Sequence, residues 1–445
     1  EEVIGSVPAG TPVDVDAAVA AARAAFDGWA ATPLEDRLAL IEGLAGQLGA
    51  RMEEIGTLIS DEMGMPRGMA TMIQAGMPAA TTGGVPGTAR EFAFEETINR
   101  TLVTREPVGV VGCITPWNFP LHQVMAKVAP ALAVGCTVVL KPSEVAPLSA
   151  FLLAEMMDDL GFPPGVFNLV SGDGPVVGEA IAAHPDVDMV SFTGSTNTGR
   201  TVMADGAATL KKVFLELGGK SAFLVLDDAD LAGACSMAAF TASMHAGQGC
   251  AITTRLVVPR NRYDEAVEAA AATMGGLEPG DPNDPGTICG PLISERQRDR
   301  VQGYLDSASA EGGRFACGGG RPASRDTGFF IEPTVIAGLD NTAKVAREEI
   351  FGPVLTVIAH DGDDDAVRIA NDSIYGLSGV VFASDLDRAK AVAGRIRTGT
   401  LGINGGLWYG ADAPFGGYKQ SGIGRQCGIE GLEIFTETKT VGWPA

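Results

Sequence analysis

The sequence lacks the features that define several classes of protein. It has four widely scattered histidines and no Cys-x-x-Cys pair, so no metal site is expected. Its seven cysteines are odd in number and dispersed, which excludes a disulfide framework and favours a reducing, cytoplasmic location. No apolar run reaches the ~20 residues that a membrane span requires, and no charged-then-apolar leader follows Glu1.

Basic residues are also scarce. Lys and Arg number 32 against 55 Asp and Glu, which gives a formal net charge of -23. This deficit argues against nucleic acid or an anionic membrane as a partner, because both favour proteins with excess positive charge. The chain is nevertheless long, at 445 residues, and 46% of them are hydrophobic. Two or three domains with large cores are therefore predicted.

The first part of the chain is predicted to be mainly helical. Apolar residues at helical spacing predict one helix over residues 14–30 and another over residues 52–63, which ends at Gly64. Between them, Thr32-Pro33-Leu34-Glu35 is a capping-box pattern that opens a further helix. A softer helix is expected over the Met- and Gly-rich residues 64–88.

Residues 93–108 change to a β-rich pattern around Asn99-Arg100. This pattern predicts a hairpin or two long strands that lie outside a core. Exposed strand edges pair with other chains unless they are covered, so this segment is expected to form a subunit contact.

From residue 108 onward, β-rich and helical segments alternate, which predicts parallel sheets with helices on both faces and ligands beyond the carboxyl ends of the strands. The first series of strands is predicted at residues 108–115, 137–140, 166–170 and 189–192. A second series, after Leu217, is predicted at residues 222–226, 255–258, 330–335, 354–359, 379–383 and 400–404. A Gly-rich loop is expected over residues 405–425 and a last strand over residues 432–441.

Three motifs at these strand ends suit a dinucleotide and a carbonyl substrate. Gly194-Ser195 opens a helix where pyrophosphate could approach free N–H groups, although a plain strand–helix turn explains it equally well. Glu144 and Lys141 could bind an adenosine ribose or simply pair with each other. A carboxylate there would repel a 2′-phosphate, which favours NAD over NADP. The amide of Asn118 could donate to an oxyanion or only to its own turn.

Cys250 and Glu216 offer a nucleophile and a base for covalent chemistry on a carbonyl. Taken singly, Cys250 is more often a buried apolar residue, and Glu216 a solvated charge at a strand end. His245 could be a base, but its position favours a helix end or a pocket wall. The acidic runs at residues 227–230 and 361–365 lack the spacing of a calcium loop and are predicted to cap helices.

Taken together, these motifs resemble those of the NAD(P)-dependent aldehyde dehydrogenase superfamily. They follow one order over nearly the whole chain, which makes the resemblance specific. The matching motifs are Pro116-Trp117-Asn118-Phe119-Pro120, Lys141-Pro142-Ser143-Glu144, Phe192-Thr193-Gly194-Ser195-Thr196, Glu216-Leu217-Gly218-Gly219-Lys220, Gly247-Gln248-Gly249-Cys250, Gly290-Pro291-Leu292, Gly328-Phe329-Phe330 with Pro333-Thr334, Glu348-Glu349-Ile350-Phe351-Gly352-Pro353 and Pro414-Phe415-Gly416-Gly417-Tyr418-Lys419.

The resemblance implies an aldehyde dehydrogenase-like α/β fold with two Rossmann-type parallel-sheet domains and a β-hairpin oligomerisation arm. It implies an NAD-binding domain at residues 1–88 and 108–217, a catalytic domain at residues 218–420 and an arm at residues 89–107 and 432–445. It also implies a homodimer or homotetramer, and a start that lacks a few tens of the family's residues.

The reaction implied by the resemblance is NAD-dependent oxidation of an aldehyde to a carboxylic acid. Cys250 would attack the aldehyde carbon, Asn118 and the Cys250 N–H would bind the oxyanion, and Glu216 would activate water. The implied cofactor-binding residues are Thr115, Pro116, Trp117, Lys141, Ser143, Glu144, Gly174, Gly194, Ser195, Leu217, Gly218, Glu349 and Phe351. The implied substrate walls, which are mostly apolar and favour apolar aldehydes, are Phe119, Gln123, Met244, Gly249, Ala251, Trp408 and Phe415.

Two alternatives stay open, and two positions depart from the family. CoA-acylating members typically lack the base that matches Glu216, so its presence favours release of a free acid. A non-catalytic structural role would not require Cys250, Glu216 and Asn118 together. Many relatives carry Asn where this chain has His245. Some carry Glu in place of Gln426, where it can relay protons with the lysine that matches Lys127.

Overall fold

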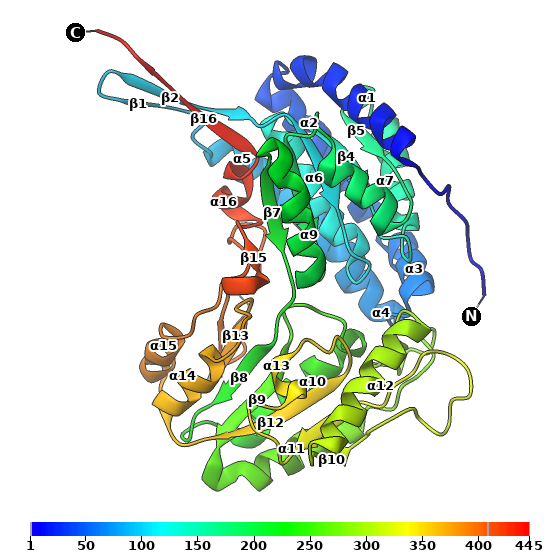
Figure 1. Ribbon diagram of the computed structural model, residues 1–445, viewed down its shortest axis with the longest axis vertical. Helices are drawn as coiled ribbons and strands as arrows, with labels where there is room; N and C mark the ends of the chain where they lie inside the picture. The colour runs from blue at the N-terminus through cyan, green and yellow to red at the C-terminus, as the bar shows by residue number, and fades with distance from the viewer. Residues whose placement is uncertain (1, 407–408, 445) are drawn as a thin grey trace.

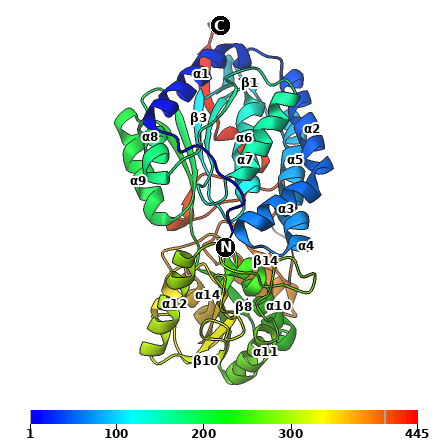
Figure 2. The same ribbon diagram turned by 90° about the vertical axis from the view of Figure 1, so that its right-hand side faces the viewer.

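The computed structural model describes residues 2–406 and 409–444, which form two parallel α/β units and a β arm (Figure 1). The two units make up the two halves of the molecule (Figure 2). The chain first crosses between them directly after β7 (Lys212–Glu216). Among the described residues, no helix combines the length and the apolar character that crossing a membrane would take.

The first unit is a six-stranded sheet with the order β15-β7-β6-β3-β4-β5, parallel except where β15 pairs with β7. Its other strands are β3 (Val110–Ile114), β4 (Thr137–Lys141), β5 (Phe167–Leu169), β6 (Met189–Thr193) and β15 (Gly422–Ile423). One face carries α1 (Pro12–Ala30), α8 (Glu179–Ala183) and α9 (Thr196–Gly206). The other carries α2 (Leu34–Ala50), α3 (Met52–Met63), α5 (Gly76–Glu91), α6 (Pro120–Val134) and α7 (Leu148–Asp159).

Strand β3 explains why the sequence is continuously apolar in the strands of this sheet. Val110 and Ile114 belong to the core cluster on the α1 face, whereas Val111 and Cys113 belong to the cluster on the α6 face. Successive side chains of a strand point to opposite faces, and in this sheet helices cover both of them.

The second unit is a seven-stranded sheet with the order β10-β11-β12-β9-β8-β13-β14, parallel except for β10 against β11. Its strands are β8 (Ser221–Val225), β9 (Thr253–Pro259), β10 (Arg314–Cys317), β11 (Thr334–Ala337), β12 (Val354–His360), β13 (Gly379–Phe382) and β14 (Gly402–Ile403). One face carries α10 (Leu231–Ser243) and α11 (Tyr263–Gly275). The other carries α12 (Glu295–Ala310), α13 (Lys344–Arg347), α14 (Asp363–Asn371) and α15 (Leu386–Ala393). The predicted α/β fold is confirmed.

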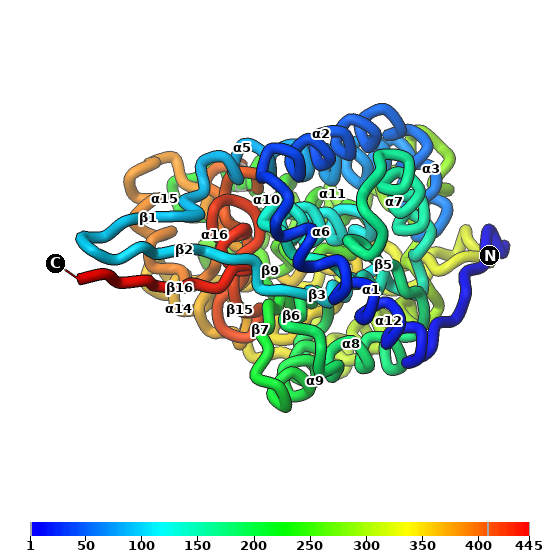
Figure 3. The backbone as a smooth tube through the Cα atoms, turned by 90° about the horizontal axis from the view of Figure 1, so that it is seen from above, coloured from blue at the N-terminus to red at the C-terminus, as the bar shows by residue number. Residues whose placement is uncertain are grey.

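The arm is an antiparallel sheet of β1 (Glu95–Ile98), β2 (Thr101–Pro107) and β16 (Thr436–Gly442). The predicted hairpin is present, and Asn99 has φ 55° at its turn. The last strand follows α16 (Gly428–Glu433), and the three strands lie side by side at one end of the molecule (Figure 3). Every residue of β1 is exposed.

The capping-box prediction at Thr32 is wrong. The Thr32 hydroxyl donates to Gly28 O at 3.0 Å, so Thr32 bonds back to the last turn of α1, and Pro33 is the N-cap of α2. Glu35 pairs with Arg90 of α5 at 2.8 Å instead of reaching back to a capping backbone. A tertiary partner has therefore replaced the local one that the pattern suggested.

The softer helix predicted over residues 64–88 contains a π-helical segment. It consists of α4 (Arg67–Met69), the π-helix η1 (Ala70–Ala75) and α5. Such segments often occur at functional sites. Here η1 carries the buried Gln74, whose amide donates to Asn118 O at 2.8 Å.

Two predictions in the second half of the chain need correction. The strand predicted at residues 330–335 begins only at Thr334, and the edge strand β10 was not predicted. The loop predicted over residues 405–425 contains β15, whose Gly422 pairs with Glu216. Both missed strands lie at sheet edges, where a short segment has little apolar pattern to reveal it.

The acidic runs do lie at helix starts. The Asp230 side chain accepts from Gly233 N at 3.2 Å and caps α10, and residues 363–365 fill the first turn of α14. Arg388 pairs with Asp227 of the first run and Asp363 of the second, at 2.7 and 2.6 Å.

Candidate active site

The structure brings Cys250 and Glu216 together where the two sheets meet. Glu216 is the last residue of β7, and Cys250 lies in the loop that leads into β9. The Cys250 thiol donates to Glu216 Oε1 at 3.6 Å. Two residues far apart in the chain are thus in contact across the junction of the units.

A left-handed stretch of backbone positions the cysteine. After α10 the chain passes through η4 (Met244–Gly247), in which His245, Ala246 and Gly247 have φ values of 53°, 49° and 72°. A Cβ on residue 247 would lie 2.1 Å from Gly352 O, so this position requires glycine. Non-glycine residues with positive φ are strained and persist only when surrounding contacts hold them.

Asn118 supplies part of that support. Its side-chain amide donates to Gln248 O at 3.0 Å, two residues before the cysteine. Its backbone oxygen accepts from His245 Nε2 at 2.9 Å as well as from Gln74. The turn interaction offered as an alternative therefore does not describe Asn118. An amide nitrogen carries two hydrogens, so one N–H remains for an oxygen that develops charge beside Cys250.

His245 supports the backbone and is not placed as a base. Its Nε2 donates to Asn118, its ring lies edge-on to Phe119 with centroids 5.4 Å apart, and burial lowers its pKa to about 4. The ring is therefore neutral at neutral pH.

Burial controls the protonation of the central pair. Glu216 is fully buried, and its Oε2 has no hydrogen-bond partner among the described residues. Burial raises the pKa of Glu216 to about 8, although the charge of Lys127 and the thiol hydrogen bond oppose the rise. Burial and the negative charges of Glu216 and Glu349 hold the pKa of the Cys250 thiol well above its usual range. The thiol therefore keeps its proton until a base removes it.

Lys127 of α6 is the buried cation near this pair. Its Nζ donates to Gln426 Oε1 at 3.0 Å and lies 4.9 Å from the centroid of the Phe214 ring. Burial lowers the pKa of Lys127 to about 8, while Cys113 and Glu216 favour its charged form. Its charge in turn stabilises the ionised form of Glu216.

A cavity of about 350 Å³ opens beside Cys250 and Asn118. Most of its walls were predicted as cofactor-binding residues, and they come from both units. These walls are Pro116, Trp117, Gly194, Ser195, Leu217, Gly218, Glu349 and Phe351.

The Glu349–Phe351 side of the cavity is tightly positioned. The Glu349 carboxylate accepts from Gly219 N at 2.9 Å, and burial raises its pKa to about 7. Phe351 has φ 64° and lies edge-on to Trp117 with ring centroids 5.4 Å apart.

The other predicted cofactor residues lie outside the cavity lining. Thr115 is buried at the end of β3, Ser143 is buried, and Gly174 begins the π-helix η2 (Gly174–Gly178). Lys141 Nζ pairs with Glu144 Oε2 at 2.7 Å, as the alternative interpretation proposed. Burial disfavours the Glu144 charge, but the hydrogen bond and charge of Lys141 outweigh it and lower the pKa of Glu144.

Four residues that line the cavity were not predicted as site residues: Thr193, Arg296, Gln297 and Arg300. The last three belong to the first turns of α12. Gln297 Nε2 donates to Phe351 O at 2.7 Å, and Arg300 Nη2 donates to Glu349 O at 2.6 Å. The available signal was Ser294-x-x-Gln297, a helix start directly after the Gly290-Pro291-Leu292 motif.

The predicted substrate residues surround the cysteine loop in part. Met244 begins η4, Phe119 packs on His245, and Gly249 and Ala251 flank Cys250. Gln123 is buried and accepts from the Thr193 hydroxyl at 3.3 Å. Trp408 lies outside the described residues.

Phe415 is buried against a residue that was not predicted. Its ring lies edge-on to Tyr409, with centroids 5.2 Å apart. The Tyr409 hydroxyl hydrogen-bonds to His122 Nε2 at 2.6 Å. The side of the site near Phe415 is thus less purely apolar than the sequence suggested.

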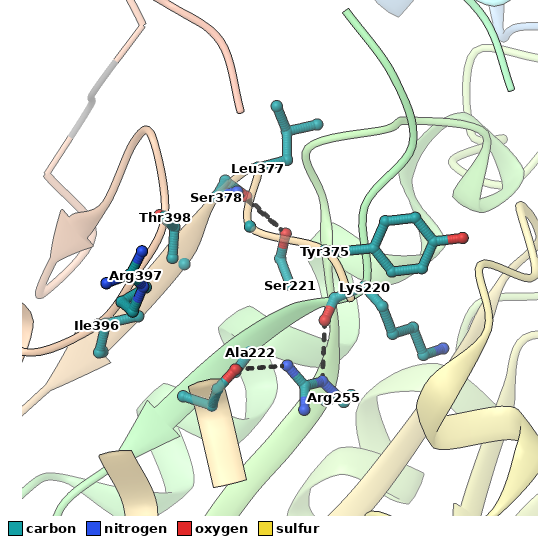
Figure 4. Close-up of a pocket in the computed structure, with 13 residues that line it drawn as sticks. Lys220, Ser221, Ala222, Arg255, Tyr375, Leu377, Ser378, Ile396, Arg397 and Thr398 are labelled. Carbon is teal, nitrogen blue, oxygen red and sulfur yellow. Dashed lines mark hydrogen bonds between the residues drawn. The ribbon is translucent and has the colours of Figure 1, made fainter. Parts of the chain in front are cut away.

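The stretch that follows Glu216 rests on a buried arginine. Arg255 of β9 donates to Lys220 O at 2.8 Å, to Asn341 Oδ1 at 2.8 Å, and to the backbone oxygens of Ile369 and Ala370. Figure 4 shows Arg255 below Lys220, and the Lys220 side chain directed away from Arg397 and Thr398.

Lys220 is itself buried. Its Nζ has no hydrogen-bond partner among the described residues, and burial lowers its pKa to about 7. Nearby, the Ser378 hydroxyl donates to Ala251 O, next to the cysteine, and also hydrogen-bonds with the Ser221 hydroxyl. The segment that follows Glu216 and the Cys250 loop are therefore both hydrogen-bonded to buried residues of the second unit, Arg255 and Ser378.

Two parallel α/β units with a thiol–carboxylate pair at their junction are the architecture of aldehyde dehydrogenases. The aldehyde dehydrogenase family model matches residues 1–441. The chain is 47% identical to 3-succinoylsemialdehyde-pyridine dehydrogenase of a Pseudomonas species and 43% identical to geranial dehydrogenase of Castellaniella defragrans, over 99% of this chain and 93% of each relative.

Solved structures agree with this similarity. A mutant of aldehyde dehydrogenase C from Pseudomonas syringae, complexed with NAD+ and octanal, has a TM-score of 0.98 and 47% identity. An aldehyde dehydrogenase of Mycobacterium tuberculosis, complexed with NAD+, has a TM-score of 0.97 and 46% identity. Each comparison covers 100% of this chain and 92% of the solved one. The chain belongs to the aldehyde dehydrogenase family and is an aldehyde dehydrogenase.

The Arg255 contacts predict a large effect on stability. Arg255→Met would leave four buried acceptors without a donor, so we expect unfolding to cost about 3 kcal/mol less than in the wild type. Urea unfolding followed by circular dichroism measures this difference. The matched control is Arg260→Ala, whose ion pair with Asp361 is 61% exposed on both sides and should contribute little. Equal midpoints for Arg255→Met and the wild type would contradict the prediction.

Proposed function

We propose that this enzyme oxidises an aldehyde to the carboxylic acid with NAD, through a covalent intermediate on Cys250. The contact of 3.6 Å between the Cys250 thiol and a buried Glu216, at the wall of a cavity of about 350 Å³, carries the proposal. A nucleophile, its base and room for a cofactor meet at one point.

The residues present fit a dinucleotide. Ser195 caps α9 by accepting from Thr198 N at 3.1 Å, and Gly194 and Ser195 line the cavity. The start of α9 therefore faces the cavity and could bind the pyrophosphate. Gly218 lets Glu349 approach closely, since a Cβ there would lie 2.3 Å from Glu349 Oε2. Glu349, Phe351 and Trp117 would hold the nicotinamide ribose and ring. When bound, NAD would accept a hydride from the substrate carbon.

The Lys141–Glu144 pair supports NAD over NADP. Since the pKa of Glu144 is lowered, its carboxylate is anionic at neutral pH and is available to ribose hydroxyls. The same charge opposes a 2′-phosphate.

In the first half-reaction, Cys250 would bond to the aldehyde carbon while Glu216 accepts the thiol proton. The carbonyl oxygen gains charge in this step, and the free N–H of Asn118 and the Cys250 N–H would donate to it. Donors already fixed in place favour the charged transition state, because they do not have to reorganise.

In the second half-reaction, Glu216 would activate water against the thioester on Cys250. Its Oε2 is available to accept a proton from water, since it has no partner among the described residues. A buried base with a pKa of about 8 suits general-base catalysis near neutral pH. This favours release of a free acid over transfer to CoA.

The substrate walls favour apolar aldehydes, either aliphatic or aromatic. Phe119, Met244 and Phe415 contribute apolar surface around the cysteine loop. The octanal complex of the Pseudomonas syringae enzyme and the geranial dehydrogenase relative support this class.

We propose the organisation implied by the sequence for the whole protein. Residues 1–88 and 108–217 would bind NAD, and residues 218–420 would carry the catalytic cysteine. The arm, whose β1 is fully exposed, would pair subunits into a homodimer or homotetramer. The seven cysteines are all free, which supports the reducing cytoplasm as the location.

The nucleophile is tested with a panel of apolar aldehydes and NAD, following NADH absorbance. We expect wild-type turnover to give the free acid, with added CoA giving no acyl-CoA. Cys250→Ala should be inactive, because within the described part of the chain no other thiol hydrogen-bonds to Glu216. Cys235→Ala, a buried cysteine on α10 away from the cavity, is the control and should keep its activity. Retained dehydrogenase activity in Cys250→Ala would overturn the assignment.

Glu216→Gln separates the two half-reactions. We expect it to keep a burst of NADH but to slow the steady state, since water then lacks its base. In the wild type the base works only when deprotonated, so kcat should rise with pH through about 8. The variant should lose this rise. Stopped-flow and steady-state rates between pH 6 and about 9 measure both effects. A variant with the wild-type rise would show that another group is the base.

Gln426→Glu probes the role of Lys127. A carboxylate at this position would attract Lys127 and weaken its effect on Glu216. The pKa of Glu216 should therefore rise, and the rising limb of the pH–rate profile should move to higher pH, by up to about one unit. Lys127→Met, which removes the cation, should move the limb in the same direction. Identical profiles for Gln426→Glu and the wild type would exclude this role.

A further inference from the structure

The first turns of α12 carry an arginine that the proposed reaction has not used. Arg296 lines the cavity together with Gly194 and Ser195 at the start of α9. It forms no hydrogen bond or ion pair with another residue among those described. Its neighbour Arg298 does not line the cavity and pairs with Glu295 and Asp299 at 2.9 and 2.8 Å. Arg296 is thus the uncommitted cation of this helix start.

The helix spacing places Arg296 along the cavity. It lies four residues before Arg300, so the two share one face of α12 about 6 Å apart along the axis. Arg300 holds the backbone oxygens of Glu349 and Ile350 at 2.6 and 3.2 Å. Glu349 is the residue proposed to hold the nicotinamide ribose, and the pyrophosphate of a dinucleotide adjoins that ribose. Arg296, one helical turn from Arg300, is therefore at a suitable distance for the pyrophosphate.

Electrostatics supports the same orientation. The positive charge of Arg296 contributes to the lowered pKa of Glu144, a residue of the first unit on the other side of the junction. The guanidinium of Arg296 is therefore within electrostatic reach of the carboxyl end of β4, and it lines the same cavity as Gly194 and Ser195 at the start of α9.

We propose that Arg296 binds the pyrophosphate of the cofactor from the second unit, opposite the N-terminus of α9. The inference rests on the proposed use of NAD. A guanidinium can donate two parallel hydrogen bonds to phosphate oxygens, and a helix N-terminus carries partial positive charge. The pyrophosphate would then join the two units, while Gln297 and Arg300 of the same helix hold the loop at its nicotinamide end.

The test is cofactor binding and steady-state kinetics with NAD and NADP. Arg296→Ala should raise the Kd and KM of NAD about tenfold, the size of one charge-assisted phosphate contact, and leave kcat within about twofold. NADP should lose affinity by the same factor, because it carries the same pyrophosphate. Arg296→Lys should restore part of the affinity, and added salt should weaken NAD binding in the wild type more than in Arg296→Ala.

The matched control is Arg298→Ala, which removes a neighbouring arginine outside the cavity and should leave the Kd of NAD unchanged. An Arg296→Ala variant that binds NAD like the wild type would overturn the inference. A loss confined to NADP would also overturn it, since the arginine would then meet a 2′-phosphate. Failure of the wild type to bind NAD or form NADH would refute the proposed function itself.

Discussion

The contact between the Cys250 thiol and the Glu216 carboxylate is the interaction on which the rest of the centre depends. Glu216 ends a strand of the six-stranded sheet, and Cys250 precedes a strand of the seven-stranded sheet. Neither sheet holds both groups, so the contact exists only because the sheets end at one junction. The chain crosses this junction again near β15, where Gly422 pairs with Glu216 and the Ser421 hydroxyl donates to Gly218 O at 2.7 Å.

The same junction excludes water and thereby couples the ionisable groups. Glu216 and Lys127 are both fully buried, and burial shifts the pKa of each toward about 8 from opposite directions. Lys127 is the main group that stabilises the charge of Glu216, while Cys113 and then Glu216 favour the charge of Lys127, in a medium of low dielectric constant. Removing either one would push the pKa of the other further toward its neutral form, so the two groups titrate as a coupled pair.

The sequence predicted the parts of the molecule that local patterns determine. The helix over residues 52–63 and its end at Gly64 are as predicted, because periodicity and a left-handed glycine act locally. Thr32 is different: its capping pattern failed because Glu35 has a partner in another helix. The motifs located the cavity walls near Ser195 and Glu349, whereas Arg296 was missed. Its proposed role depends on which face of α12 lines the cavity, and the sequence alone does not determine that face.

His245 and Gln426, the two positions at which the resemblance implied other residues, both carry neutral side chains. Each supplies a neutral hydrogen-bonding group: His245 donates to Asn118 O, and Gln426 accepts from Lys127. Because neither adds a charge, the attraction of Lys127 acts on Glu216 without competition from a carboxylate at residue 426. That attraction favours ionised Glu216 and any negative charge that forms near Cys250. A neutral residue at 426 therefore favours ionised Glu216, which in the proposed mechanism is the group that accepts the proton of Cys250.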